Sequence, residues 1–168
     1  MKKKVPGKIV LLISLLVIGG FFFINTGAVD KPASIAKFDK SLPAHIDYNL
    51  HVKPILSDKC FLCHGPDKNE GQKAGLNLST REGALAALTS GKHAIVPGKL
   101  AKSELYFRIT TPDEEMMMPK KGSNRVLTDY EKAVLIKWIE QGAEYKPHWA
   151  FIAPVKSDVP AVKNKQWV

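Results

Sequence analysis

Cysteine is scarce in this chain of 168 residues, which has only Cys60 and Cys63. Two cysteines three positions apart leave no other thiol for a framework of structural disulfides. No second pair of zinc ligands follows at finger spacing, although His93 could join Cys60, Cys63 and His64 in a four-ligand set. A redox dithiol would need a thioredoxin-like βαβ setting, and no such pattern is visible. The zinc and dithiol alternatives are therefore weakened but stay open.

A histidine directly follows the second cysteine, in the pentapeptide Cys60-Phe61-Leu62-Cys63-His64. This C-x-x-C-H pattern is typical of covalent c-type haem attachment. One helical turn can offer both thiols to the two vinyl groups of a porphyrin, while the adjacent imidazole bonds to the iron. The motif predicts a single covalently bound haem c, attached through Cys60 and Cys63, with His64 as the proximal iron ligand.

Acidic residues are absent before Asp30, whereas four lysines precede an apolar run from Ile9 to Ile24. This order is the signature of an export signal. Sixteen helical residues extend ~24 Å, less than the ~30 Å of a hydrocarbon core. The uncharged stretch continues to Val29, so two interpretations remain open: a signal peptide cleaved after Ala28, or an uncleaved anchor over residues 9–29. In both interpretations, the positive-inside bias places the rest of the chain in the periplasm or outside the cell. If the segment is uncleaved, it would anchor the protein in the inner membrane.

The formal charge of +9 falls to +5 without those four N-terminal lysines. The remaining basic residues form no stripe interleaved with aromatic residues, so we do not expect nucleic-acid binding. An acid/base pair for catalysis is also missing, because Glu114 and Glu115 are sequence neighbours that we expect to be solvated. The composition therefore does not indicate an enzyme.

Short helical patterns predict an all-α domain over residues 45–147, after a linker at 29–44 and before a tail at 148–168. The first predicted helix ends at the C-x-x-C-H motif, because Gly65-Pro66-Asp67 follows. Two more short helices are predicted at Thr80–Leu88 and Ser103–Ile109. Together with the N-terminal hydrophobic helix, these segments predict an all-α chain with one small helical domain around the haem.

The last predicted helix has the clearest start signal. Thr128 and Glu131 form a capping box, and the helix is expected to run to about Gln141, with Gly142 as its stop. One face of this helix is apolar and is predicted to lie in the core: Tyr130, Val134, Leu135, Trp138 and Ile139.

Three consecutive methionines, Met116 to Met118, lie in a polar stretch between the last two predicted helices. They could simply pack back on the core, since methionine is a common core filler. A haem iron needs a sixth ligand, however, and a thioether downstream of the motif is the expected one. Met118 is the predicted distal ligand because Pro119 would stiffen the loop. Met116 and Met117 are the alternatives, with His93 next if the ligand is not a methionine.

These pieces together resemble the planctomycete-type cytochrome c domain, a relative of the small class I c-type cytochromes. The resemblance covers about 100 of the 168 residues and is carried by Val52–Asp67, Ser79–Leu85, Ile95–Gly98, Met118–Pro119, Lys121–Gly122, Leu127–Thr128, Trp138–Ala143 and Pro147–Phe151. It implies a cytochrome c-like small helical domain wrapped around one covalent haem, with His64 and a methionine as axial ligands. In this family the domain is commonly at the head of a longer secreted protein. One departure is Lys120, where such proteins often have a second proline after Met118-Pro119.

The predicted function is single-haem electron transfer outside the cytoplasm, since two filled axial positions leave no site for a substrate on the iron. The electron-transfer partner would be a redox protein or a downstream domain. If the N-terminal segment is uncleaved, the protein would also contact the membrane through it. Two alternatives remain. One is a haem sensor or binding module in which a small ligand displaces a weakly bound methionine. The other is a haem domain that serves an enzyme domain downstream.

Overall fold

The computed structural model describes residues 29–69 and 71–156. Within these ranges the chain forms short helices and turns without strands, which confirms the mostly helical prediction. Two isolated β-bridges pair His64 with Gln72 and Ala87 with His93. The predicted signal peptide or anchor and the end of the tail lie outside the described residues. Within the described ranges, no helix has both the length and the apolar character needed to cross a membrane.

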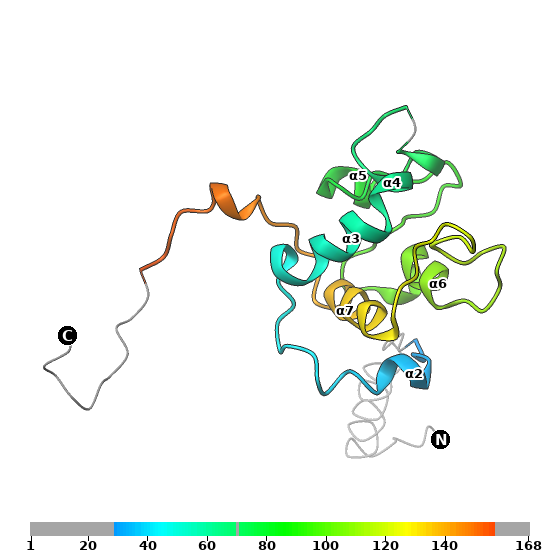
Figure 1. The fold of residues 1–168 in the computed structure, drawn as a ribbon, viewed down its shortest axis with the longest axis horizontal. Coiled ribbons are helices and arrows are strands. Elements are labelled where there is room, and N and C mark those ends of the chain that lie inside the picture. The colour runs from blue at the N-terminus through cyan, green and yellow to red at the C-terminus, as the bar shows by residue number, and fades with distance from the viewer. Residues whose placement is uncertain (1–28, 70, 157–168) are drawn as a thin grey trace, which may run out of the picture.

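Helix α7 (Asp129–Glu140) is the longest helix in the described part of the chain, and Figure 1 shows it near the middle of the fold. Its predicted capping box is confirmed: the Glu131 amide donates to the Thr128 hydroxyl at 3.2 Å, and the Thr128 amide donates to the Glu131 carboxylate at 2.7 Å. The helix stops before Gly142, whose φ of +104° suits a residue without a side chain. Most of its length is buried: Ala133, Val134, Leu135, Ile136, Trp138 and Ile139.

Tyr130 departs from the predicted core face, because 41% of its surface is exposed. Its ring lies edge-on to that of Phe38, with the ring centroids 5.7 Å apart. The first turn of α7 therefore contacts Phe38 at the surface of the domain. The buried face of the helix begins only at Ala133.

Four other segments pack against α7: α2 (Ala33–Ala36), the π-helical turn η1 (Tyr48–Val52), the 3-10 turn η3 (Leu100–Lys102) and α6 (Glu104–Thr110). The structure differs here from the linker predicted at residues 29–44. Ile35 and Leu42 are buried, and the Lys31 ammonium lies 3.0 Å from the carboxylate of Glu140. Two apolar side chains and one ion pair thus hold a mostly polar segment against the domain.

Helix α3 (Lys53–Lys59) follows η1 directly, with Pro54 in its first turn, where the missing amide hydrogen costs nothing. Helix α5 (Arg81–Leu85) begins as predicted, since the Thr80 hydroxyl accepts a hydrogen bond from the Gly83 amide. It ends three residues earlier than predicted, because Ala86 is extended. Helix α6 matches its predicted position within one residue, and residues 111–127 then form an irregular connection to α7. We call this connection the methionine loop.

Candidate haem-attachment site

The C-x-x-C-H motif forms a helical turn of its own instead of ending the first helix. Helix α3 stops at Lys59, Cys60 departs from helical geometry with φ −120°, and α4 (Phe61–His64) follows as a separate turn. The amides of Cys63 and His64 both donate to the Cys60 carbonyl, at 3.1 and 2.8 Å. One closed turn therefore carries both thiols and the imidazole, as covalent attachment to a porphyrin requires.

Both cysteines are free thiols and are partly buried. Burial raises the pKa of Cys60 to about 12, and the nearby Asp58 carboxylate acts in the same direction. Its sulfur is therefore a protonated thiol at neutral pH. Leu62, between the two cysteines, contrasts with them because 62% of its surface is exposed.

The imidazole of His64 is oriented by the loop that follows it. Its Nδ1 lies 3.2 Å from the backbone carbonyl of Lys73, which can only accept, so Nδ1 carries the proton and Nε2 keeps its lone pair. The Leu78 amide also donates to the His64 carbonyl at 2.7 Å. Burial lowers the pKa of His64, which favours the neutral ring. Metal-binding histidines typically show this arrangement, with one nitrogen tied to a carbonyl and the other free.

Gly65 allows the chain to leave the motif turn. A Cβ atom at this position would lie 2.2 Å from the Phe61 carbonyl oxygen, so no side chain fits without moving that turn. The predicted helix break after His64 is confirmed, because α4 ends there and Gly65 is extended.

An aromatic cluster supports the loop beneath His64. The rings of Tyr48, Trp138 and Tyr145 lie 4.6 to 6.0 Å apart, and the Tyr145 hydroxyl donates to the Leu78 carbonyl at 3.1 Å. Burial raises the pKa of Tyr145 and raises that of Tyr48 to about 12, so both hydroxyls stay protonated. The sequence placed Trp138 in the core, but nothing in it indicated that Tyr145 would hold the histidine loop.

The methionine loop is anchored on α6. The Met118 amide donates to the Arg108 carbonyl at 2.8 Å, and the Met116 carbonyl accepts from the Arg108 guanidinium at 3.2 Å. The same guanidinium nitrogen lies 3.5 Å from the Met116 sulfur. Met117 and Met118 are partly buried, while Met116 is 43% exposed. The Arg108 side chain thus engages Met116, whereas the thioether of Met118 has no such partner among the described contacts. The assignment of a methionine to the iron stays a prediction.

His93, the remaining candidate ligand, lies on the exposed turn after α5. Its Nδ1 is 2.9 Å from the Leu85 carbonyl, so its Nε2 also keeps a lone pair. In the part of the chain that the structure describes, however, no three histidine, cysteine or acidic side chains are grouped closely enough to hold a metal ion. The zinc alternative built on Cys60, Cys63, His64 and His93 therefore gains no support.

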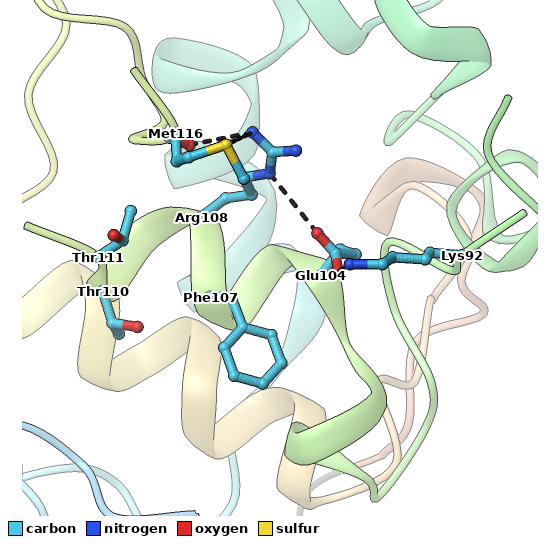
Figure 2. Close-up of a pocket in the computed structure, with 7 residues that line it drawn as sticks. All are labelled: Lys92, Glu104, Phe107, Arg108, Thr110, Thr111 and Met116. Atoms are coloured by element: carbon cyan, nitrogen blue, oxygen red, sulfur yellow. Dashed lines mark hydrogen bonds and ion pairs between the residues drawn. The ribbon is translucent and has the colours of Figure 1, made fainter. Parts of the chain in front are cut away.

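Two open cavities among the described residues are not lined by the motif. One, of about 470 Å³, lies beside α6 and includes Phe107, Arg108 and Met116 (Figure 2). The other, of about 380 Å³, lies between Tyr48, Tyr145 and the start of α5. The candidate haem site is therefore defined by the hydrogen bonds of the motif and not by either of these cavities.

Comparison with known families agrees with this geometry. Residues 60–122 match the family described as planctomycete cytochrome C. The chain contains a planctomycete cytochrome C domain. The match begins at Cys60 and includes the motif, the histidine loop and Met118, and it ends before α7.

A more distant similarity extends beyond the matched domain. The chain is 26% identical over 144 residues to hydrazine synthase subunit alpha of Kuenenia stuttgartiensis. The alignment covers 71% of this chain but only 18% of that protein, which is much longer. No solved structure matches the chain.

The residues of the cytochrome C domain fit a covalent haem. Two free thiols and a neutral imidazole with a free Nε2 lie on one turn, and membership in a cytochrome c family implies covalent haem. Cys60 and Cys63 would hold the porphyrin, and His64 would bind its iron. The sequence predicts these three residues for these roles. The sequence did not indicate that the Lys73 carbonyl would orient His64. Every residue has a backbone carbonyl, so residue type cannot mark such a partner.

Proposed function

We propose that this chain is a single-haem c-type cytochrome that transfers electrons outside the cytoplasm, with His64 and Met118 as the two axial ligands. The observation that carries this proposal is the hydrogen bond from His64 Nδ1–H to the Lys73 carbonyl, next to two free thiols on the same turn. It leaves one imidazole nitrogen available for iron and fixes the orientation of the ring.

The protein's own groups have distinct roles in this proposal. Each thiol adds across one vinyl group, forming a carbon–sulfur bond and passing its proton to the neighbouring carbon, so attachment needs no oxidant. When bound, the haem supplies an iron that exchanges one electron between the ferrous and ferric states. The soft thioether of Met118 favours the ferrous state and raises the reduction potential relative to two histidines.

Contacts in the loop favour Met118 over Met116 as the distal ligand. The Met116 sulfur lies beside the Arg108 guanidinium, and its side chain is substantially exposed. Met118 is less exposed, and its backbone is hydrogen-bonded to α6 on one side while Pro119 restricts it on the other. A restrained backbone holds the thioether in one position, which favours its bond to the iron.

The function is tested by absorption spectra of protein matured in a host with an intact c-type maturation system. We expect a pyridine haemochrome spectrum of c-type haem and a reduced spectrum that CO leaves unchanged, because both axial positions are filled. A spectrum that CO alters at once would instead favour the sensor or binding module. A protein without haem would contradict both functions and revive zinc binding.

A haem domain that serves an enzyme is the second candidate, favoured by the similarity to a subunit of a synthase. In that case the electrons would pass to a downstream domain or a partner subunit instead of a freely diffusing redox protein. Peptides from the native protein that extend past Val168, or a stable complex with a synthase-like subunit, would support it.

We also propose that export depends on residues 1–28 and that an uncleaved segment at 9–29 would anchor the protein in the inner membrane. We expect the haem-bearing protein in the periplasmic or the membrane fraction, and intact-mass analysis distinguishes the two forms. A mature N-terminus at Val29 indicates a cleaved signal peptide, whereas retention of Lys2 to Lys8 in the membrane fraction indicates an anchor. Recovery of haem-free protein with its N-terminus intact in the cytoplasm would contradict export.

A further inference from the structure

Arg108 contacts the methionine loop with both its backbone and its side chain. Its carbonyl accepts from the Met118 amide at 2.8 Å, and its Nη1 donates to the Met116 carbonyl at 3.2 Å. The two hydrogen bonds lie on either side of Met117. One residue in the last turn of α6 thus restrains the backbone at Met118, the predicted iron ligand, and at Met116, two positions earlier.

The guanidinium that makes this contact is itself oriented. Glu104, one turn earlier on α6, has one carboxylate oxygen 3.6 Å from Arg108 Nε and the other 2.5 Å from the Lys92 ammonium. Figure 2 shows Lys92, Glu104, Arg108 and Met116 in a row along one side of α6. The Glu104 side chain is only 15% exposed and that of Arg108 34%, so water screens their ion pair less than it would a fully exposed pair. The Lys92 side chain, in contrast, is 66% exposed. A planar guanidinium with several donors is suited to bind a carboxylate and a carbonyl at once.

A second arginine holds the other end of the loop. Arg125 Nε donates to the Asp58 carbonyl at 3.1 Å, and its Nη1 donates to the Ser123 carbonyl at 3.3 Å. Asp58 belongs to α3 and lies two residues before Cys60. Arg125 therefore connects the methionine loop to the helix that leads into the haem-attachment motif, across 67 positions of sequence.

We propose that Arg108 and Arg125 are positioning residues that hold Met118 at a set place relative to the haem-attachment motif. Arg108 restrains the loop from α6, and Arg125 ties its far end to α3. This inference rests on the proposed ligation by Met118. Because the thioether is a weak neutral ligand, the fraction of molecules in which it is bound depends on how far the loop is preorganised.

Imidazole competes for the sixth position of a ferric haem and so measures how firmly the protein's own ligand is held. Outer-shell partners of metal ligands typically change metal affinity about 10-fold to 100-fold when removed. We therefore expect Arg108→Ala to bind imidazole about 10-fold more tightly than the wild-type holoprotein, with the haem still covalently attached. Arg125→Ala should shift the affinity in the same direction, by less, because its contacts lie farther from Met118.

Arg81→Ala is the matched control, since Arg81 is exposed on α5 and its loss removes the same single charge. It should bind imidazole as the wild type does. If Arg108→Ala fails to mature, Arg108→Lys carries the test, because it keeps the charge but loses the planar set of donors; it should bind imidazole several-fold more tightly. Imidazole affinities equal to that of Arg81→Ala in the Arg108 variants would overturn the role of Arg108, and the same result in Arg125→Ala would overturn that of Arg125.

Hydrogen exchange separates this proposal from the ligand assignment. We expect the Met118 amide, which donates to the Arg108 carbonyl, to exchange faster in Arg108→Ala and unchanged in Arg81→Ala. A wild-type spectrum without thioether ligation would contradict Met118 as ligand. Hydrogen exchange of the Met118 amide would still measure how firmly Arg108 restrains the methionine loop. Unchanged exchange in Arg108→Ala would overturn the positioning role whatever the ligand is.

Discussion

Replacing both cysteines, as Cys60→Ser with Cys63→Ser, is expected to abolish covalent haem completely. Serine has nearly the shape of cysteine, but its hydroxyl does not add to a vinyl group under maturation conditions. Each free thiol lies on the closed turn that also carries His64, so the double variant loses both attachment points while the imidazole stays in place. Haem-peroxidase staining after denaturing electrophoresis measures the outcome: a stained band for the wild type and none for the variant.

Leu62→Ala is the matched control for this pair, because Leu62 lies between the cysteines and most of its surface is exposed. It supplies no thiol and little buried area, so the variant should stain like the wild type. A double serine variant that still stains would show that the haem is held elsewhere. A wild-type protein that never stains, even with an intact maturation system, would remove the haem interpretation.

Local signals in the sequence predicted the element starts well. Thr128 with Glu131, and Thr80 before α5, cap their helices through their own side chains, so residue type alone identifies them. The stop after His64 coincides with Gly65, a position where the close Phe61 carbonyl leaves no room for a side chain. These features depend on a few neighbouring residues and need no knowledge of the fold.

Features that depend on distant segments could not be predicted in this way. The packing of α2 on α7 rests on isolated apolar residues such as Ile35, which make no periodic pattern. The contact between Arg125 and the Asp58 carbonyl spans 67 positions, and the acceptor is backbone. The partner of His64 is likewise the Lys73 carbonyl. The sequence thus identifies the reactive groups of the site, while the groups that orient them appear only in the folded chain.

Replacing the predicted distal ligand, as Met118→Ala, should open the iron. Alanine offers no donor atom, so ferric protein should lose the weak long-wavelength charge-transfer band that thioether ligation produces. The ferrous form should then bind CO, because the sixth position becomes vacant. The reduction potential should fall by an amount on the order of 0.1 V, a fraction of the ~0.8 V range that axial ligands span. Absorption spectra with and without CO, and a redox titration, measure these three changes.

Met116→Ala and Met117→Ala are the matched controls, since they remove the same side chain at neighbouring positions of one loop. Both should keep the charge-transfer band, and Met116→Ala in particular loses only a sulfur that lies beside the Arg108 guanidinium. Loss of the band in one of these single variants, with Met118→Ala unaffected, would move the ligand to that position. A triple variant that remains low-spin would exclude methionine and direct attention to His93, whose Nε2 is free because its Nδ1 is engaged by the Leu85 carbonyl. In that case His93→Ala, added to the triple variant, should make the iron accessible to CO.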